Sequence, residues 1–248
     1  MLEALLAIVW WSGLIVALLI GLPIYILCSF VVKSERLTWL RIMICRLALK
    51  LSGQTVTVYG KRGDSIPEND PYLYMFNHTS LFDAFIAGVI FFRHVTAVAK
   101  REMFSWPLWG LTIRRYGLVP IDRDQHGQAI DTLKGVEKAI NQDRLSVIIL
   151  PEGTRSNKPW ELELFKRGPF HVALNTQATI IPIAIGGAWR AKHKGDWKIR
   201  GGQIVVCFCQ PITAEERTDM TVDALADLVR ERIRGELKTA RMLLDDKI

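Results

Sequence analysis

The segment Ser146-Val147-Ile148-Ile149-Leu150-Pro151-Glu152-Gly153-Thr154-Arg155 decides the fold class, because in it an apolar run passes directly into a polar turn. The run from Val147 to Leu150 leaves no polar side chain on either face of a strand, which predicts a strand buried on both faces. Such strands occur in parallel or mixed sheets that helices cover. We therefore expect an α/β fold in which polar groups gather where this strand ends.

Short β-rich runs and helical patterns alternate on both sides of this segment. The runs with strand character are Thr55–Tyr59, Tyr72–Phe76, Thr96–Ala99, Leu118–Ile121, Ser146–Leu150, Ile180–Ile185 and Ile204–Phe208. The helical patterns are Leu81–Phe92, Trp106–Tyr116, Gly127–Asn141, Pro169–Thr176 and Val222–Leu237. This order predicts one α/β domain over residues 54–248, with a mixed, largely parallel sheet flanked by helices.

The first 32 residues differ in character from this domain. No charged side chain occurs in the 29 residues from Ala4 to Val32. A helix needs about 20 apolar residues to cross a bilayer, whereas a cleaved signal peptide has a basic start and an apolar region of about 7–15 residues. Because this stretch is longer and follows Glu3, we expect a membrane-embedded helix from about Leu2 to Val31, with Pro23 as a candidate kink.

A second helix is expected directly after this stretch, with Ser34 as its N-terminal cap and Gly53 at its end. Its apolar residues, Trp39 among them, are mixed with basic ones, as in helices that lie at a membrane surface. An ordinary surface helix of the globular domain is the alternative. The two helices would form a membrane-embedded hairpin over residues 1–53, which we expect to serve as membrane anchor and interfacial helix.

Basic residues are distributed unequally around the apolar stretch. Glu3 precedes it, and five basic residues follow it, namely Lys33, Arg36, Arg41, Arg46 and Lys50. Because basic residues that flank a span remain on the cytoplasmic side, the α/β domain is expected in the cytoplasm, on an anionic membrane surface. The net charge of +7 would also suit nucleic acid. The sequence has no zinc-ligand spacing and no RNP-type aromatic motif, so we expect no nucleic-acid partner and no metal site.

The first segment whose residues could take part in catalysis is Asn77-His78-Thr79-Ser80-Leu81-Phe82-Asp83, which follows an apolar strand. On a continuous helix, five residues turn through about 500°, so His78 and Asp83 would point apart. If His78 lies in the turn and Asp83 in the first helical turn, the carboxylate reaches the imidazole, as an orienting group reaches a general base. Ser80 and Asp83 also fit a capping box, which is compatible with that arrangement.

The second segment is the turn Pro151-Glu152-Gly153-Thr154-Arg155-Ser156. A glycine permits close backbone approach, and a hydroxyl with a guanidinium adds donors, a combination suited to phosphate. The alternative is a structural turn with Glu152 and Arg155 paired on the surface. Further cations occur in Ile121-Asp122-Arg123 and Phe165-Lys166-Arg167-Gly168, which only the fold could bring near this turn.

Four blocks of the sequence, taken in order, resemble the motif blocks of the glycerolipid acyltransferases, most closely the 1-acylglycerol-3-phosphate acyltransferases. They are His78-x4-Asp83, Ile121-Asp122-Arg123, Pro151-Glu152-Gly153-Thr154-Arg155-Ser156 and Ile181-Pro182-Ile183. Lys100-Arg101-Glu102 resembles the family's Lys-x-Glu before the second block. The resemblance covers about residues 77–185, with one departure at Leu150, where many members have an aromatic residue.

This resemblance implies an enzyme of phospholipid synthesis. His78, held by Asp83, would take the proton from the sn-2 hydroxyl of lysophosphatidate as that hydroxyl attacks an acyl thioester, giving phosphatidic acid at the membrane. The residues implied to bind the acceptor's glycerol and phosphate are Lys100, Arg123, Glu152, Gly153, Thr154 and Arg155. The resemblance implies no cofactor. The acyl-CoA or acyl-carrier-protein thioester is a co-substrate, and a basic surface suits either acidic carrier.

Three alternatives remain open at this point. The acceptor could be another lyso-lipid, either a lysophospholipid or an aminoacyl lyso-lipid. A lipid hydrolase could use Ser80 as nucleophile with His78 and Asp83, although no nucleophile elbow is present to expose that serine. A membrane-anchored binding or scaffold protein with an inactive site is the third, and the intact polar blocks disfavour it.

Overall fold

The structure, a computed structural model, describes residues 1–60, 71–122 and 126–245. Within these ranges seven strands form one sheet in the order β1-β7-β6-β2-β5-β3-β4. The strands are β1 (Gln54–Tyr59), β2 (Tyr72–Phe76), β3 (Val95–Lys100), β4 (Val119–Ile121), β5 (Ser146–Ile148), β6 (Thr179–Gly186) and β7 (Gly202–Phe208). Strands β6, β2, β5, β3 and β4 run parallel to one another, whereas β7 pairs antiparallel with β6 and parallel with β1. The predicted mixed, largely parallel sheet is confirmed.

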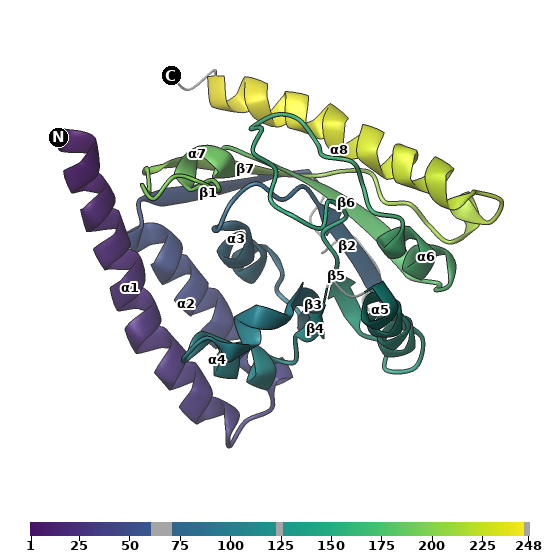
Figure 1. The fold of residues 1–248 in the computed structure, drawn as a ribbon, viewed down its shortest axis with the longest axis horizontal. Helices are drawn as coiled ribbons and strands as arrows, with labels where there is room; N and C mark the ends of the chain where they lie inside the picture. Colours follow the sequence, from purple (N-terminus) through teal and green to yellow (C-terminus); the bar gives the residue numbers. More distant parts are fainter. Residues whose placement is uncertain (61–70, 123–125, 246–248) are drawn as a thin grey trace.

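Helices cover both faces of this sheet (Figure 1). The α-helices are α1 (Leu2–Ser29), α2 (Thr38–Leu51), α3 (Asp83–Ile90), α4 (Trp109–Tyr116), α5 (His126–Asn141), α6 (Gly168–Leu174), α7 (Ala188–Ala191) and α8 (Val222–Asp245). Short 3-10 helices are η1 (Ser34–Leu37), η3 (Arg101–Ser105) and η4 (Glu215–Arg217). Helices α1 to α4 lie on one side of the sheet, and α5, α6 and α8 lie on the other.

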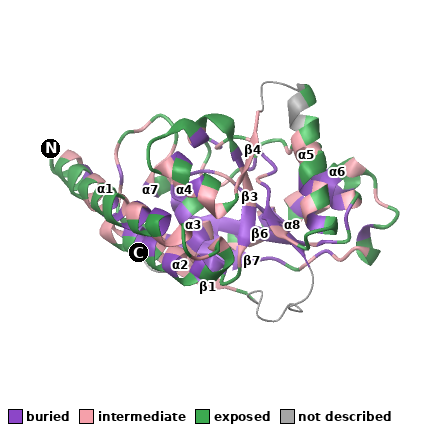
Figure 2. Cartoon of the chain, turned by 90° about the horizontal axis from the view of Figure 1, so that it is seen from below, coloured by how far each residue is buried: buried purple, intermediate pink, exposed green. Residues whose placement is uncertain are grey.

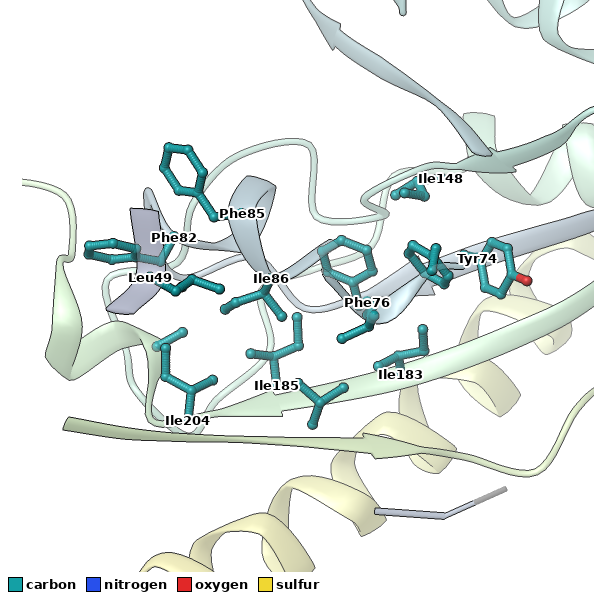
Figure 3. Packing of buried hydrophobic residues seen from close by; sticks show 14 of the residues in the cluster. Leu49, Tyr74, Phe76, Phe82, Phe85, Ile86, Ile148, Ile183, Ile185 and Ile204 are labelled. Atoms are coloured by element: carbon teal, nitrogen blue, oxygen red, sulfur yellow. The ribbon is translucent and has the colours of Figure 1, made fainter. Parts of the chain in front are cut away.

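Alternate side chains of the central strand β2 supply two hydrophobic cores, as expected for a sheet buried on both faces. On the first face Phe76 belongs to the cluster that includes Phe82 and Ile86 (Figure 3). On the second face Leu73 and Met75 belong to the cluster under α5, α6 and α8. Phe82 and Ile86 flank the first turn of α3, so their burial holds that turn against the sheet, close to the end of β2.

The predicted helical hairpin is present and tightly packed. A Cβ added to Gly13 of α1 would lie 2.1 Å from the carbonyl oxygen of Leu51, and one added to Gly21 would lie 2.7 Å from Cγ2 of Ile44. The opposite side of α1 is apolar and largely exposed (Figure 2). Among the described helices α1 is the one long and apolar enough to cross a membrane. The glycines thus allow α2 to approach one side of α1 closely. The other side of α1 contacts no other part of the described structure closely enough to be buried.

The hairpin shares a core with the sheet. Leu14 of α1 and Leu49 of α2 belong to the same buried cluster as the residues of β2 and α3. The guanidinium of Arg41 on α2 donates hydrogen bonds to the carbonyl oxygens of Gly88, at 2.9 Å, and Phe91, at 2.6 Å. A predicted basic residue of the membrane surface therefore also binds the C-terminal end of α3. The division at residue 53 stays a prediction, and across it the two parts are packed together.

Three local expectations are wrong. Ser34 does not cap the second helix, because α2 begins at Thr38 and the Ser34 hydroxyl donates to the carbonyl oxygen of Arg115, at the end of α4. Strand β5 ends at Ile148 rather than Leu150, although the N–H of Ile149 still donates to the carbonyl oxygen of Tyr74 at 3.0 Å. Helix α8 continues to Asp245, eight residues beyond the predicted end. In the first case a distant partner outweighed the local pattern.

Candidate active site

The first three predicted motif blocks lie at one edge of the sheet, and the fourth, Ile181–Ile183, lies inside β6. Because β6, β2, β5, β3 and β4 are parallel, their carboxyl ends face the same way. His78 follows β2, Lys100 ends β3, Asp122 follows β4, and the turn 151–156 follows β5. This is the edge at which open α/β sheets place their ligands. The segments that the sequence analysis singled out are thereby brought to one side of the molecule.

His78 and Asp83 are in direct contact. The Nδ1 atom of His78 lies 2.7 Å from Oδ2 of Asp83. The chain folds back between them, since His78 lies in the loop after β2 and Asp83 is the first residue of α3. The aspartate side chain is 1% exposed and the histidine side chain is 20% exposed. A buried carboxylate thus holds an imidazole whose other edge can reach a substrate.

The same carboxylate oxygen orders the loop between the two residues. Oδ2 of Asp83 also accepts the backbone N–H groups of Thr79 and Ser80, each at 2.9 Å. The carboxylate half of the predicted capping box is therefore present. The hydroxyl half is not, since the Ser80 hydroxyl accepts from Phe82 N–H and donates to the carbonyl oxygen of Lys192. Three donors on one anionic oxygen fix the imidazole and its loop together.

The second block holds the main chain of His78. One carboxylate oxygen of Glu152 accepts the backbone N–H of His78 at 2.7 Å, and the other accepts the N–H of Glu163 at 3.1 Å. The backbone N–H of Ser156 donates to the carbonyl oxygen of His78 at 2.7 Å. Burial raises the pKa of the Glu152 carboxyl, and the two N–H donors oppose that shift. Glu152 is 1% exposed and lies behind the turn, where both its oxygens already have partners.

Asn77 attaches the same loop to a third strand. Its side-chain amide donates to the carbonyl oxygen of Ile185 at 2.9 Å, and its Oδ1 accepts the N–H of Ile185 at 2.8 Å. Asn77 is 1% exposed. A buried amide that satisfies both groups of one strand residue fixes the end of β2 relative to β6. His78 therefore lies between Asn77, which is bound to β6, and Thr79, whose N–H is bound to Asp83.

The remaining predicted residues lie around this centre with fewer contacts. Gly153 has φ +68°, in the left-handed region that favours glycine, and this conformation allows the tight turn after β5. Thr154, the next residue, is exposed. Arg155 is half-buried. Lys100 is exposed and pairs with Glu102 at 2.7 Å. Since β5 separates β3 from β2, Lys100 ends a strand about 10 Å from the histidine strand. Arg123 lies outside the described residues.

Sequence reasoning missed several residues of the site. Asn77 binds Ile185 of β6, Glu163 binds Glu152, and Lys192 accepts from Ser80. Glu163 and Lys192 lie far from the His78 block in the chain. Lys192 also lies close enough to Arg155 for that charge to lower the pKa of the lysine, although burial lowers it more. The position of Asn77 directly before His78 was the one available signal. Glu163 becomes visible only when the chain after the turn 151–156 folds back on Glu152, and Lys192 only when the chain after β6 lies beside Ser80.

The arrangement argues against a serine hydrolase. Ser80 is fully buried, and its hydroxyl is used by Phe82 N–H and the Lys192 carbonyl oxygen. Its Oγ therefore does not face the histidine as a nucleophile must. A histidine with an orienting carboxylate remains, which is the arrangement of a general base that acts directly on a substrate hydroxyl.

A buried carboxylate that orients a histidine at the carboxyl edge of a parallel sheet is typical of α/β enzymes with a general base. Within that class the chain belongs to the acyltransferase family, since the family model described as Acyltransferase matches residues 55–186. The matched region contains every described site residue that the sequence predicted, and Lys192 lies just beyond it. The resemblance stated from the motif blocks is confirmed.

Similar proteins carry a more specific name. The 1-acyl-sn-glycerol-3-phosphate acyltransferase of Saccharomyces cerevisiae is 30% identical over 236 residues, covering 92% of this chain and 76% of that protein. The alpha form from Homo sapiens is 32% identical over 196 residues, covering 79% and 68%. The Cocos nucifera enzyme is 30% identical over 184 residues, covering 74% of this chain, which spans only 58% of that relative's length.

A solved structure shows the same fold. The 1-acyl-sn-glycerophosphate (LPA) acyltransferase from Thermotoga maritima superposes with a TM-score of 0.82 over 96% of each chain, at 19% identity. The match includes nearly the whole chain, so it extends to the N-terminal hairpin as well as the sheet. At this identity the likeness supports the architecture alone.

Proposed function

We propose that this protein transfers an acyl group from an acyl thioester to the sn-2 hydroxyl of 1-acylglycerol-3-phosphate, giving phosphatidic acid. The observation that carries the proposal is the 2.7 Å contact between Nδ1 of His78 and Oδ2 of Asp83, together with the 20% exposure of the His78 side chain. The relatives named as 1-acyl-sn-glycerol-3-phosphate acyltransferases support the choice of acceptor. Another lyso-lipid acceptor would use the same base and differ at the surrounding residues.

The contact to Asp83 supports a proton on Nδ1 of His78, with Nε2 as the acceptor. Nε2 takes the proton of the sn-2 hydroxyl while the hydroxyl oxygen forms a bond to the thioester carbonyl carbon. The carbon–sulfur bond then breaks, and the thiolate that leaves is protonated by the imidazolium. Asp83 stabilises the imidazolium between these steps. No acyl group is attached to the protein.

The acceptor's phosphate is proposed to bind the turn after β5 and the cations around it. Gly153 allows backbone N–H groups to approach the phosphate, Thr154 offers a hydroxyl, and Arg155 offers a planar pair of donors. Lys100 and Arg123 complete the set predicted from the resemblance, and we add Lys192 because it lies beside Arg155. Glu152 belongs to the set in a different way, since it contacts the backbone of His78 and acts as a positioning residue.

Purified full-length protein tests the reaction when it is supplied with a radiolabelled acyl thioester and a panel of lyso-lipids. We expect phosphatidic acid from lysophosphatidate, and one free thiol released for each acyl group transferred. Release of free fatty acid without an acceptor would indicate a hydrolase. Equal rates with lyso-lipids that lack a phosphate monoester would contradict the proposed acceptor.

We also propose that the hairpin anchors the enzyme in a membrane, with the α/β domain on the cytoplasmic face. Exposed apolar side chains on α1, such as Ile20 and Leu27, would contact lipid, and exposed Trp39 and Met43 on α2 would lie at the interface. Because Leu14 is part of the core that α1 shares with the sheet, deleting α1 would also expose apolar core residues of the α/β domain. Substitutions on the lipid-facing side are therefore the better test.

Wild-type protein in isolated membranes should resist a high-salt wash and require detergent. The double substitution Ile20→Lys and Leu27→Lys should move part of the protein to the wash, because two charges disfavour insertion while salt screens the remaining attraction. Ile130→Lys, at an exposed apolar residue of α5, is the matched control and should stay bound. Labelling of a cysteine near His78 from outside an intact cell would contradict the orientation.

A further inference from the structure

A cleft with basic walls lies between α8 and the loop that follows the turn 151–156. Its volume is about 380 Å³, within the range of small-ligand sites. The residues that define this α8 cleft are Trp160, Leu162, Arg230, Arg234, Lys238 and Arg241. The four basic residues follow one another at helical spacing along one side of α8. Glu161 also lines the cleft and pairs with Lys158 at 2.6 Å. Outside the lining, Glu231 pairs with Arg234, and Asp245 pairs with Arg241 at 3.7 Å.

One wall of the α8 cleft is directly joined to the candidate active site. The loop between Ser156 and Glu163 is closed by a 3.1 Å hydrogen bond from the Ser156 hydroxyl to Oε1 of Glu163. Both residues that close it also bind the His78 region, Ser156 through its N–H to His78 and Glu163 through its N–H to Glu152. Trp160, inside this loop, contributes its indole to the cleft.

Trp160 also places the cleft close to the edge of the sheet that carries His78. A Cβ added to Gly186, the last residue of β6, would lie 3.1 Å from the Trp160 ring. The neighbouring residue Ile185 is the one that Asn77 binds, and Asn77 precedes His78. The cleft therefore opens beside the carboxyl end of β6, the strand that Asn77 joins to the His78 loop.

The position and chemistry of the cleft indicate a water-soluble anionic ligand. The cleft lies on the α8 side of the sheet, whereas the apolar hairpin covers the opposite side (Figure 1). Arg230 donates to the Leu162 carbonyl oxygen, and its Nε is a buried donor without a partner among the described residues. Arg241 lies 5.7 Å over the Trp160 ring, which holds its guanidinium in place. Guanidinium groups in fixed positions suit phosphates.

We propose that the α8 cleft binds the phosphorylated nucleotide end of an acyl-CoA donor. The inference rests on the acyl-transfer function proposed above and identifies the carrier of the acyl group. The nucleotide of CoA carries a 3′-phosphate and a diphosphate, and its flexible pantetheine arm would extend past Gly186 toward His78. An acyl carrier protein presents a broad convex surface, which a concave cleft of this size suits less well.

Binding of unacylated CoA to purified full-length protein in detergent micelles, measured by calorimetry, tests this proposal. The variant Arg234→Ala/Lys238→Ala should bind CoA about 10-fold more weakly or worse, because two charge-assisted contacts are lost. Both side chains are at the surface, so the melting temperature should change little. Lys134→Ala/Lys138→Ala on α5 has the same spacing and charge change and should bind CoA as the wild type does.

Two further measurements separate the possible outcomes. Wild-type protein should bind 3′-dephospho-CoA more weakly than CoA, and the α8 variant should lose most of that difference. CoA binding that is unchanged in the α8 variant would overturn the proposal, as would a KM defect confined to an acyl-carrier-protein donor. His78→Ala should bind CoA normally. Loss of binding in the α8 variant of a protein that acylates no lyso-lipid would support the cleft while refuting the proposed function.

Discussion

The loop that carries His78 and the turn that carries Arg155 lie at the same edge of the sheet, yet they are held very differently. The histidine has its ring bound by Asp83 and its backbone N–H and C=O bound by Glu152 and Ser156. Arg155 is half-buried, and Thr154 beside it is exposed. The first region is fixed in one arrangement, and the second has side chains that can move to meet a ligand.

This difference separates the two parts of the proposed reaction. A general base works only when it is held within hydrogen-bonding reach of its proton, so it needs a rigid support. Phosphate recognition tolerates adjustment, because a long cationic side chain can follow the ligand. We therefore expect substitutions in the His78 loop to lower kcat and substitutions in the Arg155 turn to raise KM for the acceptor.

The largest effect is expected from His78→Ala. Loss of the base should lower kcat for acyl transfer by about 10²- to 10⁴-fold, with the KM for the acceptor little changed. His171→Ala, at an exposed histidine of α6, is the matched control and should retain the wild-type rate. Near-normal transfer by folded His78→Ala protein would remove the histidine from the mechanism.

Asp83→Asn should be nearly as severe, with a loss of about 10²-fold in kcat. Asparagine keeps the shape of the side chain but removes the negative charge that stabilises the imidazolium. Its amide would also replace Oδ1 of Asp83, a buried atom without a hydrogen-bond partner among the described residues. Steady-state kinetics and a melting curve, measured together, distinguish this loss from unfolding. A rate close to that of the wild type would show that the carboxylate charge is dispensable.

Arg155→Ala should act mainly on the acceptor. A charge-assisted contact to phosphate contributes about 1.5–3 kcal/mol, so KM for lysophosphatidate should rise by about 10- to 100-fold. Arg155→Lys should recover part of the loss, because lysine keeps the charge without the paired donors. If the KM for the thioester rises instead, Arg155 belongs to the donor side of the site and the comparison drawn above fails.

Glu152→Gln should reduce kcat by about 10-fold without a large change in either KM. Glutamine keeps one acceptor and places an N–H₂ group against a backbone donor, which weakens the support of His78. A readout that separates positioning from acceptor binding is the KM for lysophosphatidate. A large rise in that KM with unchanged kcat would place Glu152 in contact with the acceptor, as the motif resemblance first implied.

The smallest effect concerns pH and stability. Because burial raises the pKa of Glu152, the folded chain holds this proton more tightly than the unfolded chain. The stability contributed by this group therefore falls as pH rises from about 4.3 through the raised pKa. Glutamine does not titrate, so the melting-temperature advantage of the wild type over Glu152→Gln should shrink across that interval. A difference that stays constant with pH would contradict this.

The sequence was sufficient for the sheet and for the polar blocks, because both follow from local pattern. Apolar runs such as Val147–Leu150 indicate buried strands, and the rule that parallel strands share a carboxyl edge places the blocks together. It was not sufficient for the bonds that join the blocks. The contact of Ser156 with His78 and that of Asn77 with Ile185 depend on strand order, which no local pattern encodes.

Two residues have partners that their local sequence pattern did not indicate. Ser34 is a good helix cap by its chemistry, but a carbonyl oxygen of α4 reached by packing takes its hydroxyl instead. Glu152 resembles a ligand-binding carboxylate by its motif, but the fold buries it behind the turn. In both cases the residue type is informative, and its partner is decided by the tertiary structure.

The central claim is that Asp83 fixes His78 with its proton on Nδ1 and its Nε2 free to accept. The most direct test is the solid-state ¹⁵N spectrum of the full-length protein in lipid vesicles with labelled histidine, in which the His78 signals are assigned by their loss in His78→Gln. At neutral pH we expect a protonated Nδ1 and an unprotonated Nε2 on this ring. The opposite tautomer, with the proton on Nε2, would contradict the account.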